Sequence, residues 1–92
     1  MTNEQYLLTL LAEECAEVSQ RATKAIRFGL DDPKGTQEGF STNKERLLWE
    51  INDLIAVIEL LFGDDYISEG LKNHKKEKIE KYTQLSKEIG QL

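Results

Sequence analysis

Apolar residues recur every three or four positions in the first third of the chain, and the positions between them are mostly polar. No glycine or proline interrupts residues 3–28, so this spacing places the apolar side chains on one face of an α-helix. The members of this face are Leu7, Leu8, Leu11, Cys15, Val18, Ala22, Ala25 and Ile26. The pattern predicts a long amphipathic helix from Asn3 to about Phe28, with Gly29 just past its end.

A second run with the same periodicity follows a turn-rich connection that contains Pro33 and several glycines. Its start is predicted between Ser41 and Asn43, because Ser, Thr and Asn all cap helices well, and its end near Gly63. The apolar residues of this run are Leu47, Leu48, Ile51, Leu54, Ile55, Val57, Ile58 and Leu61. The connection is long for two packed helices, and loops of this length are often functional lids or partly disordered.

Beyond Gly63 the pattern predicts a short helix from Tyr66 to about Leu71 and a lysine-rich helix from about Lys72 to Ile89. The sequence therefore predicts one all-α domain over residues 1–92, a bundle of about four helices whose two long helices are central and antiparallel. A chain this small buries only about two-thirds of its surface on folding. Leu48 and Ile55 also lie on a flank that the first helix would leave uncovered, so we expect oligomerisation to complete the bundle.

Charge is unevenly distributed along the 92 residues: residues 1–70 carry a net charge of −8 and residues 71–92 one of +3. The acidic balance argues against stable nucleic-acid binding, which needs a broad basic surface. No segment approaches the ~20 consecutive apolar residues of a membrane helix. The N-terminus also lacks the basic region and cleavage site of a signal peptide. We therefore expect a cytoplasmic protein that does not associate with membranes.

Cys15 and His74 are the only residues of their types, so the usual nitrogen and sulfur ligands of zinc cannot be assembled. Cys15 lies on the predicted apolar face, and we interpret it as core filling. His74 has no obvious partner and is interpreted as a surface residue. The chemistry of the chain is expected to depend on oxygen ligands instead.

Two pairs of carboxylates occupy equivalent positions on the two long helices. At about 100° per residue, Glu14 projects just outside the first apolar face, and Glu17 lies about 60° further round. Glu50 and Asp53 take the same rotational places on the second helix. Antiparallel packing through the apolar faces would therefore bring all four acids to one seam. Glu13 lies further from the face and would be a supporting group or plain surface.

Four facing carboxylates cannot all stay ionised without positive charge, because each raises the proton affinity of the others. A hard divalent cation, which prefers oxygen ligands, would supply that charge. Arg21 and Lys24 would supply it from within, since they follow Glu17 at i+4 and i+7 on the same side. These two residues cannot easily serve all four acids, yet paired glutamates are also common on bundle surfaces, and both interpretations stay open.

These acids stand in EECAE, Glu13 to Glu17, and EIND, Glu50 to Asp53. The two segments resemble the EExxE and ExxD motifs of the MazG-like all-alpha nucleoside triphosphate pyrophosphatases. The flanking LLAEECAEVSQRATKAIRFG and ERLLWEINDLIAVIELL look like the central helices of that family, and KIEKY, Lys78 to Tyr82, is similar to a segment of its last helix. The resemblance covers most of the chain, and it implies an all-α fold assembled as a homodimer or homotetramer.

The resemblance implies an enzyme that cleaves a nucleoside triphosphate between its α and β phosphates, giving a monophosphate and pyrophosphate. It implies Mg²⁺, with Mn²⁺ as an alternative, bound on the triphosphate. The implied metal ligands are Glu14, Glu17, Glu50 and Asp53, and Glu13 would support them or position water, so that all five would be catalytic. Such chemistry needs no nucleophilic side chain.

Phosphate groups also require positive charge from the protein, and an aromatic side chain could stack on a base. The candidate substrate-binding residues are Arg21, Lys24, Arg27, Lys78, Lys81, Tyr82 and Trp49. Two features depart from the family. Between Glu17 and Glu50 lie 32 residues, more than is usual, and Tyr82 stands where many relatives carry asparagine. The preferred base is therefore not predicted.

Three functions remain compatible with the sequence. The resemblance favours a magnesium-dependent nucleoside triphosphate pyrophosphohydrolase that cleans or controls the nucleotide pool. A phosphoribosyl-ATP pyrophosphatase is similar to it in fold and motif. A third function, from a different class, is a catalytically silent helical module that binds a partner protein or a nucleotide and uses the acids only in salt bridges.

Overall fold

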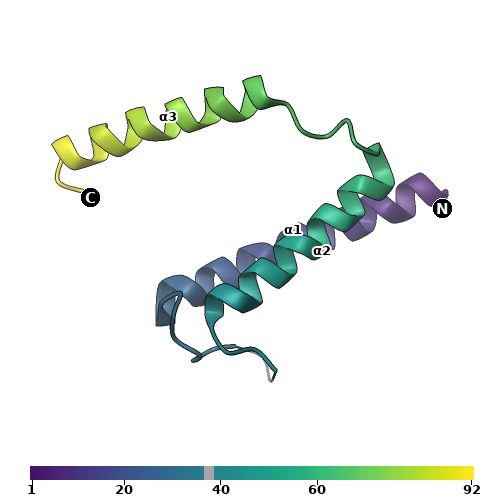
Figure 1. Cartoon of the computed structure of the whole chain (residues 1–92), viewed down its shortest axis with the longest axis horizontal. Coiled ribbons are helices and arrows are strands. Elements are labelled where there is room, and N and C mark those ends of the chain that lie inside the picture. The colour runs from purple at the N-terminus through teal and green to yellow at the C-terminus, as the bar shows by residue number, and fades with distance from the viewer. Residues whose placement is uncertain (37–38) are drawn as a thin grey trace.

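The computed structural model describes residues 1–36 and 39–92, which form three α-helices and no strand. Helix α1 spans Asn3–Phe28, α2 spans Asn43–Phe62 and α3 spans Glu69–Glu88. Figure 1 shows α1 and α2 side by side and antiparallel, with α3 running apart from both. The all-α prediction and the antiparallel pair of long helices are confirmed.

Each helix begins after a hydroxyl side chain that accepts a hydrogen bond from the backbone N–H three residues further on. These residues are Thr2, Thr42 and Ser68. Gly29 and Gly63 end α1 and α2 with φ angles of +92° and +64°, which side chains other than glycine rarely adopt. Local signals thus fix both ends of the long helices close to where the sequence predicts them.

The final third of the chain differs from the prediction of two helices. The segment from Gly63 to Ser68 consists of turns and extended residues, and a single helix runs from Glu69 to Glu88. The reason is that Ser68 caps this helix by accepting from the backbone N–H of Leu71, which places Leu71 inside its first turn. The described residues therefore form three helices, and a separate short helix from Tyr66 is not among them.

The buried face of α1 is rotated from its predicted centre. Leu7, Leu11 and Val18 are partly buried as expected, but Leu8 is 44% exposed and Ile26 is 86% exposed. Cys15 is also exposed, so its interpretation as core filling is wrong for this chain. A single neighbouring helix covers only a narrow strip of α1, and that strip lies nearer to Glu14 than the apolar pattern suggests.

The described part of the connection between α1 and α2 is held against the helix ends by Asn43, which is 3% exposed. Its side-chain amide donates to the carbonyls of Gly29 at 3.0 Å and Lys34 at 2.8 Å. Gly35 lies so close to the ring of Phe28 that an added Cβ would come within 2.6 Å of it. These contacts keep the loop beside the α1–α2 seam.

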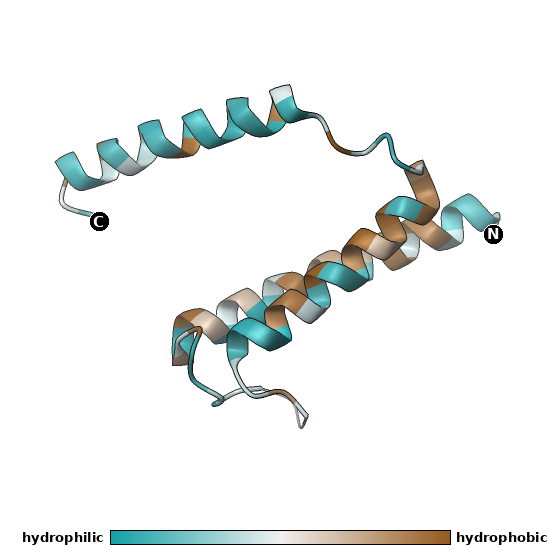
Figure 2. Ribbon diagram, viewed as in Figure 1, coloured by the Kyte–Doolittle hydropathy of each residue, from teal (hydrophilic) through white to brown (hydrophobic). Residues whose placement is uncertain are grey.

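Helix α3 contacts neither α1 nor α2 within the described part of the chain. Figure 2 shows it as mostly hydrophilic with isolated hydrophobic residues. Of its apolar side chains, Leu71 is 72% exposed and Ile79 is 52% exposed. Among the described residues, Val57 is the one buried hydrophobic residue, at 8% exposure. None of the described helices has the length and apolar character that crossing a membrane requires.

Candidate metal centre

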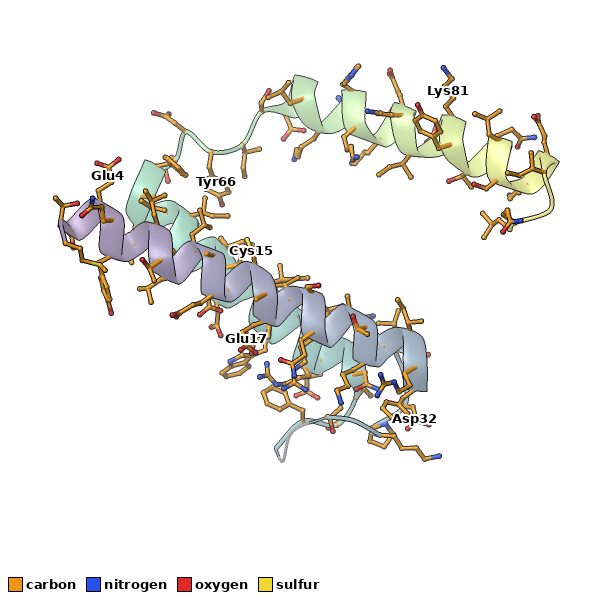
Figure 3. All side chains as sticks on the ribbon, turned by 180° about the vertical axis from the view of Figure 1, so that it is seen from behind. Glu4, Cys15, Glu17, Asp32, Tyr66 and Lys81 are labelled. Carbon is orange, nitrogen blue, oxygen red and sulfur yellow. The ribbon has the colours of Figure 1, made fainter. Side chains whose placement is uncertain are left out.

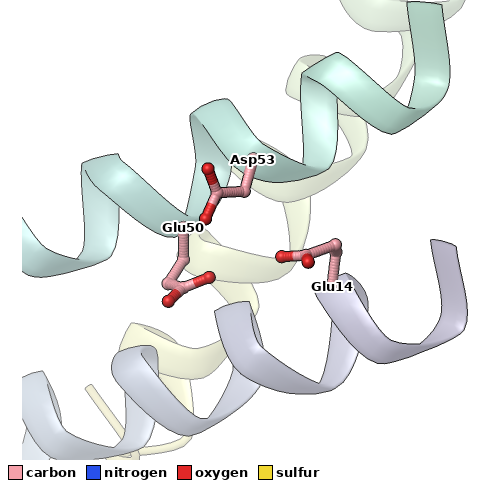
Figure 4. Close-up of side chains that lie close together, drawn as sticks. All are labelled: Glu14, Glu50 and Asp53. Atoms are coloured by element: carbon pink, nitrogen blue, oxygen red, sulfur yellow. The ribbon is translucent and has the colours of Figure 1, made fainter. Parts of the chain in front are cut away.

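Three of the four predicted acids converge at the seam between the long helices. One carboxylate oxygen from each of Glu14, Glu50 and Asp53 lies within 4.8 Å of the others. Figure 4 shows Glu14 reaching from α1 toward the two side chains of α2. Glu50 is 5% exposed, Glu14 is partly buried and Asp53 is exposed, so this carboxylate trio opens to solvent on one side.

The antiparallel register explains the convergence. In such a pair, a step toward the C-terminus of one helix corresponds to a step toward the N-terminus of the other. With Glu14 beside Asp53, Glu17 stands level with Glu50. Glu17 is exposed and lies outside the trio, but its charge still acts on Glu14. The structure therefore places three predicted acids together and the fourth next to them.

The surroundings of Glu14 raise the pKa of its carboxyl above the usual value. Desolvation at the seam is the largest cause, followed by the negative charges of Asp53, Glu50 and Glu17. The Oε2 atom of Glu14 is buried and has no hydrogen-bond partner among the described residues. A buried carboxylate oxygen without a partner is costly, so a cation or a proton at this position would stabilise it.

Glu50 has an internal partner that the sequence reading did not single out. It forms an ion pair with Arg46, one turn earlier on α2, and both side chains are buried. The ring of Phe40 lies 4.9 Å from the guanidinium carbon of Arg46, and it packs edge to face against Trp49 with the ring centroids 5.5 Å apart. The loop before α2 therefore covers Arg46 with an aromatic ring.

The remaining predicted residues of α1 differ in burial. Arg21 and Lys24 are partly buried, and Nη1 of Arg21 donates to the carbonyl of Gly35 at 3.3 Å. Glu13 is exposed, and so is Arg27, whose guanidinium lies 5.9 Å from the ring centroid of Phe28. Of the three predicted cations of α1, Arg21 and Lys24 are thus partly buried, whereas Arg27 is exposed to solvent.

The predicted residues of α3 do not reach the trio within this chain. Lys78, Lys81 and Tyr82 are all exposed on a helix that contacts neither α1 nor α2 in the described structure. Figure 3 shows Lys81 on α3, well separated from the Glu17 side of α1. Trp49 behaves differently: it is 59% exposed and lines an open groove that also includes Asp53.

Two residues at the site were not predicted from the sequence: Arg46 and Phe40. A signal existed for Arg46, because a basic residue four positions before an acid on a helix is a recognised pairing. The same projection that aligned Glu50 with the apolar face also aligns Arg46 with it. No comparable signal exists for Phe40, since its packing depends on how the loop folds back.

Comparison of the chain with models of protein families, with curated proteins and with solved structures gave no match. The chemistry must therefore be judged from the site itself. Its donors are oxygens, two of the three side chains are at least partly buried, and one oxygen lacks a partner. This donor set fits a hard divalent cation such as Mg²⁺ or Mn²⁺, while Arg46 offsets the charge of one acid only.

Proposed function

We propose that this chain is a magnesium-dependent nucleoside triphosphate pyrophosphohydrolase of the nucleotide pool, acting in the cytoplasm. It would cleave its substrate between the α and β phosphates, with Mn²⁺ as an alternative to Mg²⁺. The observation that carries the proposal is the convergence of Glu14, Glu50 and Asp53 from two antiparallel helices. The EECAE and EIND segments, which resemble the motifs of MazG-like pyrophosphatases, supply the reaction class.

The proposed cation would be held by the carboxylate trio, with Glu17 close enough in register to join it. When bound, it would neutralise charge on the phosphates and favour attack by water. The protein's own residues would do the rest. Arg21 and Lys24 supply positive charge beside the acids, Glu13 supports them, and Trp49 offers an aromatic surface in the groove shared with Asp53.

We also propose that the active form is a homodimer or homotetramer. Leu8, Ile26 and the apolar side chains of α3 are exposed in the single chain, and solvent exposure of such residues is unfavourable. Lys78, Lys81 and Tyr82 would contribute to substrate binding only if association brings α3 of one copy toward the seam of another. Light scattering at micromolar concentration should give at least twice the mass of the chain, and a monomer would contradict this part.

Release of pyrophosphate tests the proposed activity directly. The purified chain with Mg²⁺ should produce pyrophosphate and a monophosphate from at least one member of a nucleoside triphosphate panel, followed by mass spectrometry. Glu50→Gln should abolish turnover. Glu59→Gln, an equal change on the exposed part of α2, should retain it. No metal-dependent turnover across the panel would favour the silent module instead.

A further inference from the structure

Arg46 is more deeply buried than an arginine normally is, at 7% exposure. Its guanidinium carries a full charge, yet its one ion-pair partner among the described residues is Glu50. Its Nε atom is buried and has no hydrogen-bond partner in the described structure. Because a buried guanidinium with an unused donor is costly, this N–H group is available to an acceptor that the described residues do not provide.

A second arginine lies in the same layer of the seam. Arg46 precedes Asp53 by two helical turns, and Arg21 follows Glu14 by the same distance on the antiparallel helix. With Glu14 beside Asp53, this register sets Arg21 level with Arg46. The Nε atom of Arg21 is likewise buried without a partner among the described residues. The seam therefore carries a layer of acids and, next to it, a layer of two guanidinium groups.

Glu50 belongs to both layers. Its carboxylate neutralises Arg46, and it is also one of the three acids that converge with Glu14. A divalent cation on Glu50 would stand close to the guanidinium, and two positive charges in a poorly hydrated seam repel each other strongly. A phosphate oxygen bound between them would relieve this repulsion, and guanidinium groups match phosphate geometry well.

We propose that Arg46 changes partner when the site fills. In the free protein it is the counter-ion of Glu50. When a divalent cation binds the carboxylate trio and takes over the neutralisation of Glu50, the guanidinium of Arg46, together with that of Arg21, binds a phosphate oxygen of the substrate that arrives with the cation. This inference rests on the metal site proposed above. It makes Arg46 a competitor of the free cation and a ligand of the cation–phosphate complex.

The two roles predict opposite changes in affinity when Arg46 is replaced, so binding measurements can distinguish them. Binding of Mn²⁺ alone and of the preformed Mn²⁺–pyrophosphate complex would be followed by electron paramagnetic resonance on the full chain. Arg46→Met removes the competitor, so Mn²⁺ alone should bind about three- to tenfold more tightly. The same variant removes a phosphate ligand, so the complex should bind at least about tenfold more weakly, as expected for losing a charge-assisted contact.

Two further variants separate this effect from bulk charge and from misfolding. Lys44→Met removes one positive charge from an exposed position of the same helix, and it should change both affinities by less than about twofold. Arg46→Lys keeps the charge but loses the planar donor group. It should bind Mn²⁺ alone as the wild type does and the complex several-fold more weakly.

The outcomes distinguish the inference from the proposed function. If Arg46→Met weakens both ligands, or changes neither, Arg46 is a structural counter-ion and the partner change is wrong, while the metal site stands. If Arg46→Met does not fold, Arg46→Lys gives the test instead. An affinity of Arg46→Lys for the Mn²⁺–pyrophosphate complex equal to that of the wild type would contradict the partner change. If the wild type does not bind Mn²⁺, or if Glu14→Gln binds Mn²⁺ as tightly as the wild type does, both the metal site and the inference fail.

Discussion

Helices α2 and α3 have the same length of 20 residues, and each is capped by a hydroxyl side chain, but they differ in what surrounds them. Helix α2 packs along α1, buries Val57 and Glu50, and is tied through Asn43 to the loop that precedes it. Helix α3 has no neighbour among the described residues. Most of the stability of a helix in a protein comes from packing against its neighbours, and among the described residues α3 lacks the packing that α2 has.

This difference also separates the candidate site residues into two groups. The acids and the cations of α1 and α2 lie along one seam, where helix packing fixes their relative positions. The other group, Lys78, Lys81 and Tyr82, lies on α3, which packs against neither long helix in the described part of the chain. The proposed chemistry therefore depends on the α1–α2 pair, and any role of α3 depends on association. Substitutions matched between the two regions can break or sharpen this contrast.

Introducing a charge into each helix, at buried Val57 of α2 and at exposed Ile79 of α3, should give the largest difference. Val57→Asp places a carboxylate in the α1–α2 seam and should lower the free energy of unfolding by about 3 kcal/mol or more. Ile79→Asp on α3 should leave the intrinsic stability of the α1–α2 pair within about 0.5 kcal/mol and act on association instead. Urea unfolding followed by circular dichroism, together with light scattering, measures both. Equal losses of stability at low protein concentration would contradict the contrast.

Two asparagines offer a milder comparison. Asn43→Ala removes the side-chain hydrogen bonds to Gly29 and Lys34 and should cost about 2 kcal/mol, because two part-buried hydrogen bonds are lost. Asn73→Ala, in the exposed first half of α3, should be neutral or slightly stabilising, since alanine favours helices. Thermal unfolding compares the two. An Asn43→Ala variant as stable as Asn73→Ala would show that the loop is not held by Asn43.

The sequence predicts the α1–α2 pair well because its signals are local. Gly29 and Gly63 mark the helix ends, and helical projection brings Glu14, Glu50 and Asp53 to one seam. The projection misses the rotation of the α1 face, since an apolar pattern records every neighbour that a helix will meet, including those outside the chain. Leu8 and Cys15 fit this explanation: they belong to the apolar pattern and are exposed in the single chain.

The position of α3 could not be predicted for a related reason. Its caps and periodicity specify a helix, but nothing in its own sequence states which surface covers Ile79 or Tyr82. Arg46 was missed for a different reason: basic partners of the acids were predicted on the first long helix but not on the second. Phe40 depends on a loop fold that has no periodic signal. The helices and the seam of acids were thus predictable, and the spacing of Arg46 and Glu50 carried a signal for their ion pair, while the positions of α3 and Phe40 had none.

Glu14 should produce a smaller, pH-dependent difference. Its pKa is raised in the folded protein, so the folded state holds this proton more tightly than the unfolded state. In the absence of metal, the stabilisation that comes from this tighter proton binding is fully present below the unfolded pKa of 4.5. It is lost as the pH rises through the raised folded pKa and Glu14 ionises. Glu14→Gln should therefore gain stability relative to the wild type between pH 4 and pH 7, measured by urea unfolding in EDTA.

Glu59→Gln is the control for that titration, because Glu59 is an exposed acid of α2 away from the trio. Its stability relative to the wild type should vary less with pH than that of Glu14→Gln. If the gap between Glu14→Gln and the wild type is the same at pH 4 and pH 7, Glu14 is not held in a desolvated, negatively charged seam.

The response of thermal stability to Mg²⁺ tests the metal centre most directly. A ligand that binds only the folded state raises the melting temperature, and the increase grows with the logarithm of its concentration above its Kd. We predict that millimolar Mg²⁺ raises the melting temperature of the wild type above its value in EDTA, and that Glu14→Gln loses this increase. A wild type that melts at the same temperature with and without Mg²⁺, or a Glu14→Gln variant that gains as much, would contradict a metal site at Glu14, Glu50 and Asp53.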